Sequence, residues 1–451
     1  MNNNCQVEDG LPVEPQDVRP WGRALIWLLL LGPFFFISYN SANWLASQQG
    51  EVLYVVFEWE HYIPFVPWTI LPYWVIDALY VISLFVCATK MELDSHARRL
   101  LTAQVIAVAF FILIPMGFSF ERPSTDGFAG DLFVLLSSFD QPFNQAPSLH
   151  IALLVILWGL FIRHLPRIML WPFHVLCFLI GVSVLTTYQH HFIDVPTGAL
   201  LGWFCVWLWP ENGQMMFATK GRAYQQKRRR IALFYFSAAS LLCVLALYIG
   251  NTALWLFWPA ASLLLVSVIY FSVGSAGFQK SENGVIKLSA RCLLWPYLLA
   301  ARLNSRFWTR NNDVANHITE AVWLGRFPSR GDIEKNNYSA VIDMTAEFSA
   351  PKNNISWHAI PCLDLITADR QRIMSAADLL EQHNANGPVL VSCALGYSRS
   401  AVVVMAWLLS TRRVRDVEAA LQAVQSKRPC IVIKDSDIKV LTEIAHAHND
   451  R

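Results

Sequence analysis

A cysteine and an arginine stand six residues apart in VLVSCALGYSRSAVVV, where a short apolar run ends and a helical pattern begins. The backbone N–H groups of such a loop, with a helix N-terminus behind it, can hold an anion. Gly396 lets the backbone approach the anion closely, and Arg399 can bind two phosphate oxygens with its planar guanidinium. The same positive field favours the thiolate of Cys393, whose attack on phosphorus would give a phosphocysteine. The leaving alkoxide or phenolate would then need a proton.

This region resembles the dual-specificity branch of the protein tyrosine phosphatases. The resemblance covers about residues 312–445. It is carried by the segments ITEAVWLGRFP (318–328), VIDMTAE (341–347), CALGYSRS (393–400) and KRPCIVI (427–433). It implies a soluble α/β phosphatase domain that works without a cofactor.

The same resemblance assigns roles to individual residues. Cys393 would be the nucleophile, and Arg399 would hold the phosphate. Ser400 would help to release the phosphocysteine. Asp364, 29 residues before the cysteine, matches the general acid, and Asp369 is the alternative in the same segment.

One position departs from that pattern. The family usually has His directly before the nucleophile, and this chain has Ser392, which brings the rate but not the class of reaction into question. Two other interpretations remain open, namely a structural cysteine in a strand–turn–helix unit and a phosphatase without turnover that only binds phosphorylated partners. Asp364 could also serve only to form a turn. No two cysteines stand at metal-ligand spacing, so we expect no metal.

A second set of ionisable residues lies beside apolar segments in the N-terminal half, in FERPS (120–124), APSLH (146–150) and TTYQHHFIDV (186–195). Polar residues at the ends of membrane helices are costly and usually functional. His190 and Asp194 are four residues apart and therefore share one side of a helical turn. A carboxylate on one ring nitrogen of a histidine makes the other nitrogen a better nucleophile.

These three segments are similar to the motifs of the type 2 phosphatidic acid phosphatase superfamily, which forms a phosphohistidine without metal. The resemblance implies that His190 is the nucleophile and Asp194 its partner. It implies that His150 is the acid, and that Arg122 and Ser148 bind phosphate.

Two departures from these motifs remove positive charge. Pro115 stands where the first motif has Lys, and Val184 stands where the third has Arg. A site with fewer cations suits a phosphodiester better than a monoester dianion. The segment YIPFVPWTILPYW (62–74) also resembles the branch that contains inositol phosphorylceramide and sphingomyelin synthases. Hydrolysis of a lipid phosphate and transfer of a phospho-headgroup between lipids therefore both remain open.

The composition separates two halves with different solvents. Hydrophobic residues make up 55% of the 451 residues and charged residues only 15%, against about 25% in soluble proteins. A helix needs roughly 20 apolar residues to cross a bilayer. We expect eight spans, at about 24–40, 66–88, 100–119, 149–162, 168–188, 195–211, 231–249 and 252–274. The net charge of +2 argues against nucleic-acid binding.

The loops between the expected spans alternate in charge, which predicts the orientation. The stretch 41–65 and the stretches 189–194 and 250–252 contain no Lys or Arg, and 120–148 contains only Arg122. The other loops are basic, with Arg19, Arg23, Lys90, Arg98, Arg99, Arg163, Arg167, Lys220, Arg222, Lys227, Arg228, Arg229 and Arg230. Positive loops face the cytoplasm, so both termini are expected there.

Past residue 275 the pattern changes. VIKLSARCLLWPYLLAARL (285–303) predicts an amphipathic helix at the membrane surface. Short apolar runs at 323–327, 340–344, 357–360 and 388–392 predict strands, and 370–385, 399–411 and 415–427 have helical spacing. This alternation predicts an α/β layer structure with a mainly parallel sheet.

The sequence thus predicts a polytopic helical membrane domain followed by a soluble α/β phosphatase domain. The expected limits are 1–23 for a cytoplasmic segment, 24–211 for the lipid-phosphatase-like domain, 212–274 for two further spans, 275–307 for an interfacial linker and 308–451 for the phosphatase domain. Expected partners are membrane lipids and a phosphorylated protein or small molecule, and the fusion resembles a bacterial inner-membrane type. Two alternatives are a headgroup transferase with a regulatory or vestigial phosphatase tail and a lipid-sensing receptor. The sequence does not indicate an oligomeric state.

Overall fold

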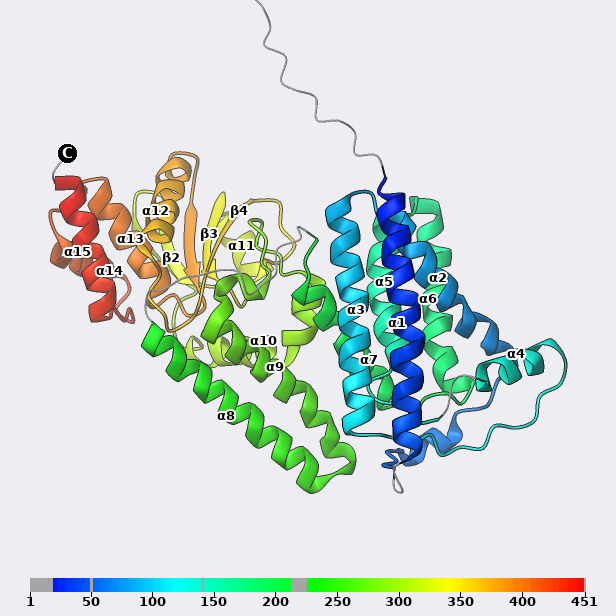
Figure 1. Ribbon diagram of the computed structural model, residues 1–451. Helices are drawn as coiled ribbons and strands as arrows, with labels where there is room; N and C mark the ends of the chain where they lie inside the picture. The colour runs from blue at the N-terminus through cyan, green and yellow to red at the C-terminus, as the bar shows by residue number, and fades with distance from the viewer. Residues whose placement is uncertain (1–18, 49–51, 139–141, 212–224, 450–451) are drawn as a thin grey trace, which may run out of the picture. The chain divides into compact units, whose positions relative to one another are not determined.

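The computed structural model describes residues 19–48, 52–138, 142–211 and 225–449 (Figure 1). The chain divides into two compact units, residues 1–215 and 216–451. Residues 1–18 of the expected cytoplasmic segment 1–23, and the basic residues Lys220 and Arg222, lie outside the described residues.

The first unit is built from helices. They are α1 (Trp21–Ser47), α2 (Ile70–Val86), α3 (Lys90–Leu113), α4 (Gly127–Ser137), α5 (Leu149–His164), α6 (Arg167–Thr186) and α7 (Asp194–Leu208), with short 3₁₀ turns at Glu58–Tyr62 and Pro67–Thr69. Helices occupy the first six stretches where spans were expected, and many of them are apolar. Among the described residues of the whole chain, six helices are long and apolar enough to cross a membrane. The expected count of eight spans, which includes the shorter α5 and α7, stays a prediction.

One expected span had the wrong bounds. The sequence predicted 100–119, whereas α3 begins at Lys90 and ends at Leu113. Thr89 caps this helix by accepting a hydrogen bond from the Glu92 N–H, which places the start ten residues earlier. Pro115 follows the end and cannot continue it. The short helix α4 was not expected, because its surroundings read as a loop.

Two glycines in α7 allow it to pack directly against α5. A Cβ on Gly198 would lie 2.4 Å from the Ser148 carbonyl oxygen, and one on Gly202 would lie 2.7 Å from the Ala152 carbonyl oxygen. Ser148 caps α5 by accepting from the Ile151 N–H. This close approach brings the beginning of α5 beside the beginning of α7, where the expected histidine site lies.

The second unit begins with a helical hairpin. It consists of α8 (Gln225–Ile249), a 3₁₀ turn (Asn251–Leu256) and α9 (Phe257–Val268), which is followed by a π-helical turn (Ile269–Val273) and a 3₁₀ turn (Ser275–Phe278). A long helix, α10 (Leu288–Trp308), leads to the sheet domain and contains residues 288–303 of the stretch 285–303 that was expected to be amphipathic. Ser267 in α9 donates to the Ala232 carbonyl in α8, which ties the hairpin together.

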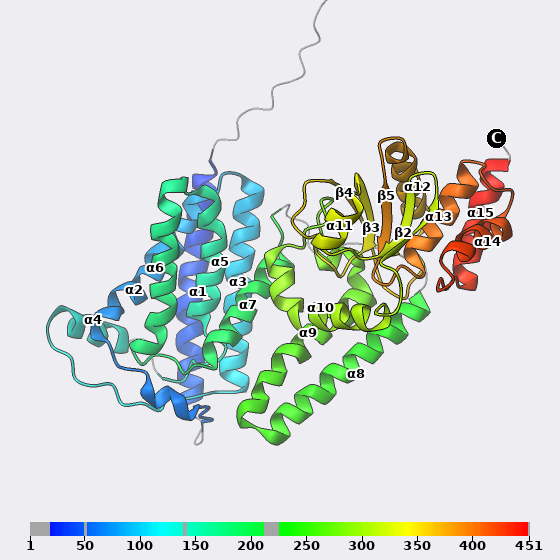
Figure 2. The same ribbon diagram turned by 180° about the vertical axis from the view of Figure 1, so that it is seen from behind.

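The remainder of the second unit is an α/β domain with a five-stranded sheet (Figure 2). The strands β1 (Ala315–Thr319), β2 (Val322–Arg326), β3 (Ala340–Thr345), β4 (Ser356–Cys362) and β5 (Val389–Cys393) follow the order β1-β2-β5-β3-β4. All neighbours are parallel except β1 and β2. The helices are α11 (Arg330–Asn336), α12 (Arg370–Asn384), α13 (Arg399–Ser410), α14 (Val417–Lys427) and α15 (Asp435–Asn449).

Alternate residues of the central strands enter two different cores, as the period of two in a strand requires. Ile342 and Val391 pack with α12 and α13 on one face, whereas Val341 and Leu390 pack with Ile333 of α11 on the other. The expected α/β architecture and mainly parallel sheet are confirmed. The sequence missed β1, α11 and α15. The run ANHIT in β1 lacks an apolar pattern because its strand lies at the edge of the sheet and is mostly half-buried or exposed.

Candidate active site

The loop between β5 and α13 is held from outside through its carbonyl groups. Ser305 of α10 donates to the Ala394 carbonyl at 2.6 Å. Arg428 donates to the carbonyls of Leu395 and Gly396, and the Val432 N–H donates to that of Tyr397. The C=O and N–H of a trans peptide point in opposite directions, so the N–H groups of residues 395–398 face away from these donors. The loop thus forms the N–H cradle that an anion requires.

Gly396 is the position where this loop needs glycine. Its φ is +72°, and a Cβ there would lie 2.4 Å from the backbone carbon of Gly325 in β2. A side chain would therefore push the loop away from the strand or strain the backbone.

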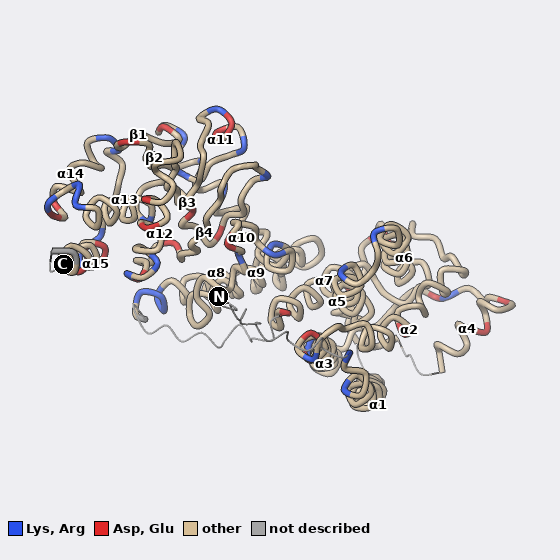
Figure 3. Tube along the Cα trace, turned by 90° about the horizontal axis from the view of Figure 1, so that it is seen from above, with Lys and Arg blue, Asp and Glu red and all other residues tan. Residues whose placement is uncertain are grey.

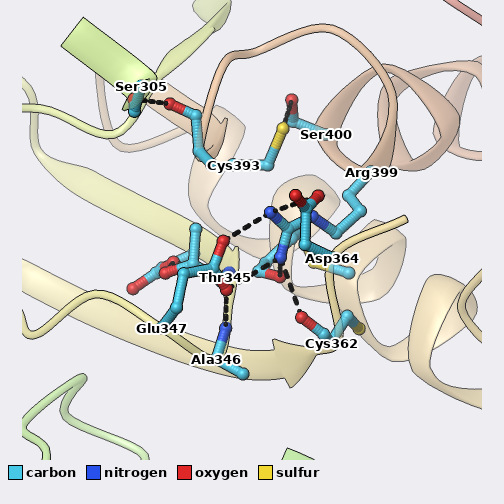
Figure 4. Close-up of polar contacts among 12 residues, drawn as sticks. Ser305, Thr345, Ala346, Glu347, Cys362, Asp364, Cys393, Arg399 and Ser400 are labelled. Carbon is cyan, nitrogen blue, oxygen red and sulfur yellow. Dashed lines mark hydrogen bonds and ion pairs between the residues drawn. The ribbon is translucent and has the colours of Figure 1, made fainter. Parts of the chain in front are cut away.

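Cys393 ends β5 and is buried. The Ser400 hydroxyl donates to its sulfur at 3.2 Å (Figure 4). A donor on the sulfur stabilises a thiolate, both before attack and when the thiolate leaves again. Ser400 lies in the first turn of α13, next to Arg399, so one helix start positions both side chains.

Arg399 is buried and holds a fixed orientation. Its Nη2 lies 2.6 Å from Glu347 Oε1 and 3.0 Å from Asp364 Oδ1, and its Nη1 donates to the Cys362 carbonyl at 2.8 Å (Figure 4). Burial alone would lower the pKa of Arg399, but the charges of Glu347 and Asp364 raise it well above its usual value. The guanidinium therefore stays charged beside the loop.

The structure separates the two aspartates that the sequence left as alternatives. Asp364 is half-exposed and lies against Arg399, in the turn after β4. Asp369 instead caps α12, where its carboxylate accepts from the Arg372 N–H at 2.9 Å. Of the two, only the carboxylate of Asp364 makes a described contact with the site, and its role as the acid stays a prediction.

Three residues of this site were missed at the sequence level. Glu347 orients Arg399, Arg428 holds the loop, and Ser305 reaches it from α10. Glu347 and Arg428 lie within the quoted segments 341–347 and 427–433. The first segment is buried throughout, so the charge of Glu347 was a signal, whereas the second mixes buried and exposed residues and gave none for Arg428. For Ser305 no sequence signal existed, because its contact spans 89 residues.

Comparisons with known proteins agree with this geometry. Residues 322–447 match the family model described as dual specificity phosphatase, catalytic domain. This segment is a dual specificity phosphatase catalytic domain. The protein is therefore a phosphoric monoester hydrolase of the protein tyrosine/serine/threonine phosphatase type.

Two viral relatives each match a stretch of 125 residues of this chain. The dual specificity protein phosphatase OPG106 of Vaccinia virus (strain Western Reserve) is 27% identical over 125 residues, which cover 27% of this chain and 73% of the relative. The dual specificity protein phosphatase H1 of Variola virus is 26% identical over the same shares. A crystal structure of PTPMT1 in complex with PI(5)P is 21% identical, covers 31% of this chain and 99% of its own, and has a TM-score of 0.29. The active form of Tk-PTP is 23% identical with a TM-score of 0.28, over 30% of this chain and 98% of its own.

The first unit brings most of the second expected set together. His190 Nδ1 lies 3.1 Å from Asp194 Oδ2, and His190 Nε2 lies 3.1 Å from the Ser148 hydroxyl. The same Asp194 oxygen accepts from the His191 backbone N–H at 3.0 Å. These hydrogen bonds fix the ring orientation of His190 between the start of α7 and the start of α5.

A cavity of about 370 Å³ opens beside this group. Both His150 and His190 line it, and the ring of His150 stacks on Tyr73 at 4.2 Å. The rest of its wall is mainly apolar and aromatic, with Phe35, Phe36, Tyr39, Trp74 and Tyr80.

Arg122 reaches the same segment at another point. Its Nε donates to the Thr187 carbonyl at 3.3 Å, three residues before His190, and its guanidinium lies over the Phe133 ring. The structure thus places Arg122 next to the segment that contains the histidine.

A buried pair that the sequence did not indicate supports this turn. The His191 Nε2 accepts from the Ser119 N–H at 3.1 Å, so its Nδ1 carries the proton and donates to Glu60 at 3.2 Å. Burial favours the protonated form of Glu60, but the hydrogen bonds from His191 and from the backbone of Phe57 and Phe192 outweigh it and lower the pKa of Glu60. His191 therefore acts as a structural neighbour of His190.

Proposed function

We propose that this protein is a membrane-bound phosphatase with two phosphate-handling sites on opposite faces of a bacterial inner membrane. The proposal extends the phosphatase domain to the limits 308–451 and assigns 24–211 to a type 2 phosphatidic acid phosphatase-like domain. The two further helices over 212–274 and the linker 275–307 would connect the two domains. Both termini would face the cytoplasm, since the basic loops lie on that side.

The cysteine site would remove phosphate from a phosphomonoester in two steps. In the first, the Cys393 sulfur bonds to phosphorus, the P–O bond to the leaving group breaks, and Asp364 gives that oxygen its proton. In the second, water attacks phosphorus and passes a proton to Asp364 while the S–P bond breaks, with Ser400 donating to the departing sulfur. Inorganic phosphate leaves, and the thiolate is restored.

One observation carries this assignment. The carbonyls from Ala394 to Tyr397 all accept hydrogen bonds from donors outside the loop, which supports N–H groups that face the opposite side. In the proposed site, Arg399 and the Cys393 sulfur would act on a phosphate held there. Backbone and guanidinium donors aimed at the equatorial oxygens stabilise the charge that develops during transfer.

The hydrogen-bonded group at His190 supports a second activity on lipid phosphate. Asp194 holds the Nδ1 side of the ring, which leaves Nε2 as the nucleophile toward phosphorus. His150 would protonate the leaving oxygen, and water would then hydrolyse the phosphohistidine. A lipid acceptor in place of water would make the reaction a headgroup transfer, and lipid binding without turnover would make the unit a receptor.

Two single variants of the purified full-length protein test both assignments. Cys393→Ser should lower aryl phosphate turnover by at least about 10³-fold and leave lipid phosphate turnover intact. His190→Ala should do the reverse. Full aryl phosphatase activity in Cys393→Ser would remove the cysteine assignment. A labelled headgroup found on an acceptor lipid, rather than as free phosphate, would identify a transferase. No turnover change in either variant would favour the receptor.

A further inference from the structure

The helical hairpin of the second unit contacts the active site directly. Tyr270, in the π-helical turn after α9, donates its hydroxyl to the Asp364 carbonyl at 3.2 Å. Arg228, near the start of α8, donates to the Tyr270 carbonyl at 2.9 Å. The residue proposed as the general acid is therefore supported by the end of a helix pair that is apolar enough to cross a membrane.

The linker after the hairpin is also built into the catalytic domain. The Lys280 ammonium is fully buried, pairs with Asp343 of β3 and donates to the Thr345 carbonyl at 2.8 Å. The Ser275 hydroxyl accepts from Arg372 of α12 at 3.0 Å. Removing one partner of a buried ion pair strongly destabilises the fold. These contacts therefore hold the segment that follows the hairpin in one arrangement against the catalytic domain.

The length of the second hairpin arm sets the depth of the site. Residues Asn251–Val273 number 23, which gives roughly 34 Å at 1.5 Å per residue. The hydrocarbon core is about 30 Å thick, with headgroup layers outside it. Tyr270 lies three residues from the end of this arm, hence at the level of the headgroups, and Asp364 lies in contact with it.

The helix α10 has two chemically different sides. Ser305 faces the catalytic loop, and Leu293, Leu294 and Tyr297 are buried. The exposed side carries large apolar residues, namely Leu288, Trp295, Leu299, Leu303, Phe307 and Trp308. An exposed apolar side with basic neighbours is typical of helices that lie in a membrane surface. The helix that holds the phosphate loop thus offers a second anchor at the same depth.

Basic side chains gather between the hairpin and the site. Lys434 donates to the Leu365 carbonyl at 3.3 Å, directly after Asp364. Burial lowers the pKa of Lys434, and the positive charge of Lys227 at the start of α8 lowers it further. The carboxylates of Asp437 and Asp364 act in the other direction and raise this pKa. Figure 3 shows Lys and Arg gathered at the start of α8.

We propose that the natural substrate of the Cys393 site is a phosphomonoester on the headgroup of a lipid in the membrane that holds the hairpin. This inference rests on the proposed cysteine phosphatase. The hairpin contact places the catalytic loop at headgroup depth, and the basic residues attract anionic headgroups near a charged surface. A phosphorylated protein would have to bring its phosphate into the same layer.

The test uses the full-length protein with His190→Ala, reconstituted in phosphatidylcholine vesicles. The probes are phosphatidic acid and a phosphatidylinositol monophosphate in the vesicles, their deacylated headgroups in solution, a phosphotyrosine peptide and an aryl phosphate. We expect kcat/KM for at least one lipid to exceed that of its deacylated headgroup and of the peptide by about tenfold or more. Cys393→Ser on this background must abolish turnover of both the lipid and the aryl phosphate.

A charge variant gives a second, milder readout. Lys227 is exposed at the start of α8, so Lys227→Gln should preserve folding. It should lower the ratio of lipid to aryl phosphate turnover several-fold at low salt, with the difference fading as salt screens the charge. Lys335→Gln, exposed on α11, is the matched control and should leave the ratio unchanged.

The outcomes distinguish a failure of the lipid assignment from a failure of the cysteine phosphatase assignment. Faster turnover of the peptide than of either lipid, with lipids no better than their deacylated headgroups, would overturn the lipid assignment while leaving the cysteine phosphatase in place. Retained aryl phosphatase activity in Cys393→Ser would instead overturn the proposed function itself.

Discussion

The cysteine site and the histidine site place their charges in different ways. At the cysteine site, a loop of backbone N–H groups and a buried guanidinium provide positive potential, and two carboxylates hold that guanidinium. At the histidine site, the described hydrogen bonds around His190 run from Asp194 through His190 to Ser148, and Arg122 contacts the neighbouring Thr187 carbonyl.

This difference indicates which phosphate each site can hold. A monoester dianion carries two charges and needs a strong, fixed positive field. A diester, or a lipid whose acyl chain fills an apolar cavity, gains more of its binding energy from the chain. The comparison therefore predicts a large dependence on one arginine at the cysteine site and a smaller one at the histidine site.

The largest effect should come from replacing that arginine. Arg399→Lys keeps the charge but loses the fork that binds two oxygens, and it should lower kcat/KM for an aryl phosphate by about 10²–10³-fold. Arg122→Lys should lower lipid phosphate turnover less. Initial rates of both variants measure the contrast, and thermal unfolding controls for folding. An equal loss in both sites would break the comparison.

The next effect concerns the proton donor. Asp364→Asn should lower turnover of an alkyl phosphate by about 10²-fold or more, because an amide cannot protonate the leaving oxygen. The loss should be smaller for an aryl phosphate with an acidic leaving group, and the limb of the pH profile that reports the acid should disappear.

Asp369→Asn is the matched control for this prediction. Its carboxylate caps α12, and Asn is an equally good cap, so neither the rate nor the pH profile should change. A lost limb in Asp369→Asn, with a normal profile in Asp364→Asn, would exchange the two assignments.

The sequence predicted the catalytic loop because its parts are contiguous. Cys393, Gly396, Arg399 and Ser400 lie within eight residues, and the strand before them and the helix after them fix their geometry locally. The parallel strands could also be predicted from the sequence, because a buried strand is a short apolar run.

The supports of the sites could not be predicted in the same way. Ser305 and Glu347 meet the loop across 89 and 52 residues, and Glu60 meets His191 across 131. Nothing in the local pattern of such residues reports a distant partner. Likewise, the pairing of Lys280 with Asp343 depends on how the linker crosses the sheet domain, which periodicity does not encode.

The buried carboxylate of Glu60 supports the histidine site, which gives a prediction about stability. Glu60 is buried, and its carboxylate accepts from His191, Phe57 and Phe192. Glu60→Gln should lower the free energy of unfolding by about 1–3 kcal/mol, because at least one buried donor loses its acceptor. Thermal unfolding in detergent at neutral pH measures the loss, and the aryl phosphatase activity of the second unit should be unchanged at low temperature.

The pH dependence of this effect has a definite sign. The pKa of folded Glu60 is lowered, so its stabilisation is present above the usual value of about 4.3 and is lost as the pH falls through the folded value. The difference between wild type and variant should therefore shrink on acidification. If the stability difference between wild type and variant grew at low pH, the carboxyl of Glu60 would be protonated in the folded state and its hydrogen bonds would be those of a neutral group.

The smallest effect is expected at the residue before the nucleophile. The Ser392 hydroxyl is buried and has no hydrogen-bond partner among the described residues. It stands in register with Asp343, whose own carboxylate is already bound by Lys280, Thr345 and Trp357. A buried hydroxyl without a partner costs free energy, so Ser392→Ala should raise the free energy of unfolding by up to about 1 kcal/mol. Aryl phosphate turnover should change by less than about tenfold, since no hydrogen bond links this hydroxyl to the loop.

Variants at and near Ser392 test whether the replacement of the usual His by Ser affects the rate of phosphate hydrolysis. Asp343 stands in register with Ser392 on the neighbouring strand and forms a buried ion pair with Lys280 of the linker. Steady-state kinetics of Ser392→Ala and Lys280→Met would then differ, with the second variant losing both stability and turnover. A large fall in kcat for Ser392→Ala alone would show instead that the hydroxyl turns toward the sulfur during the reaction and replaces the histidine directly.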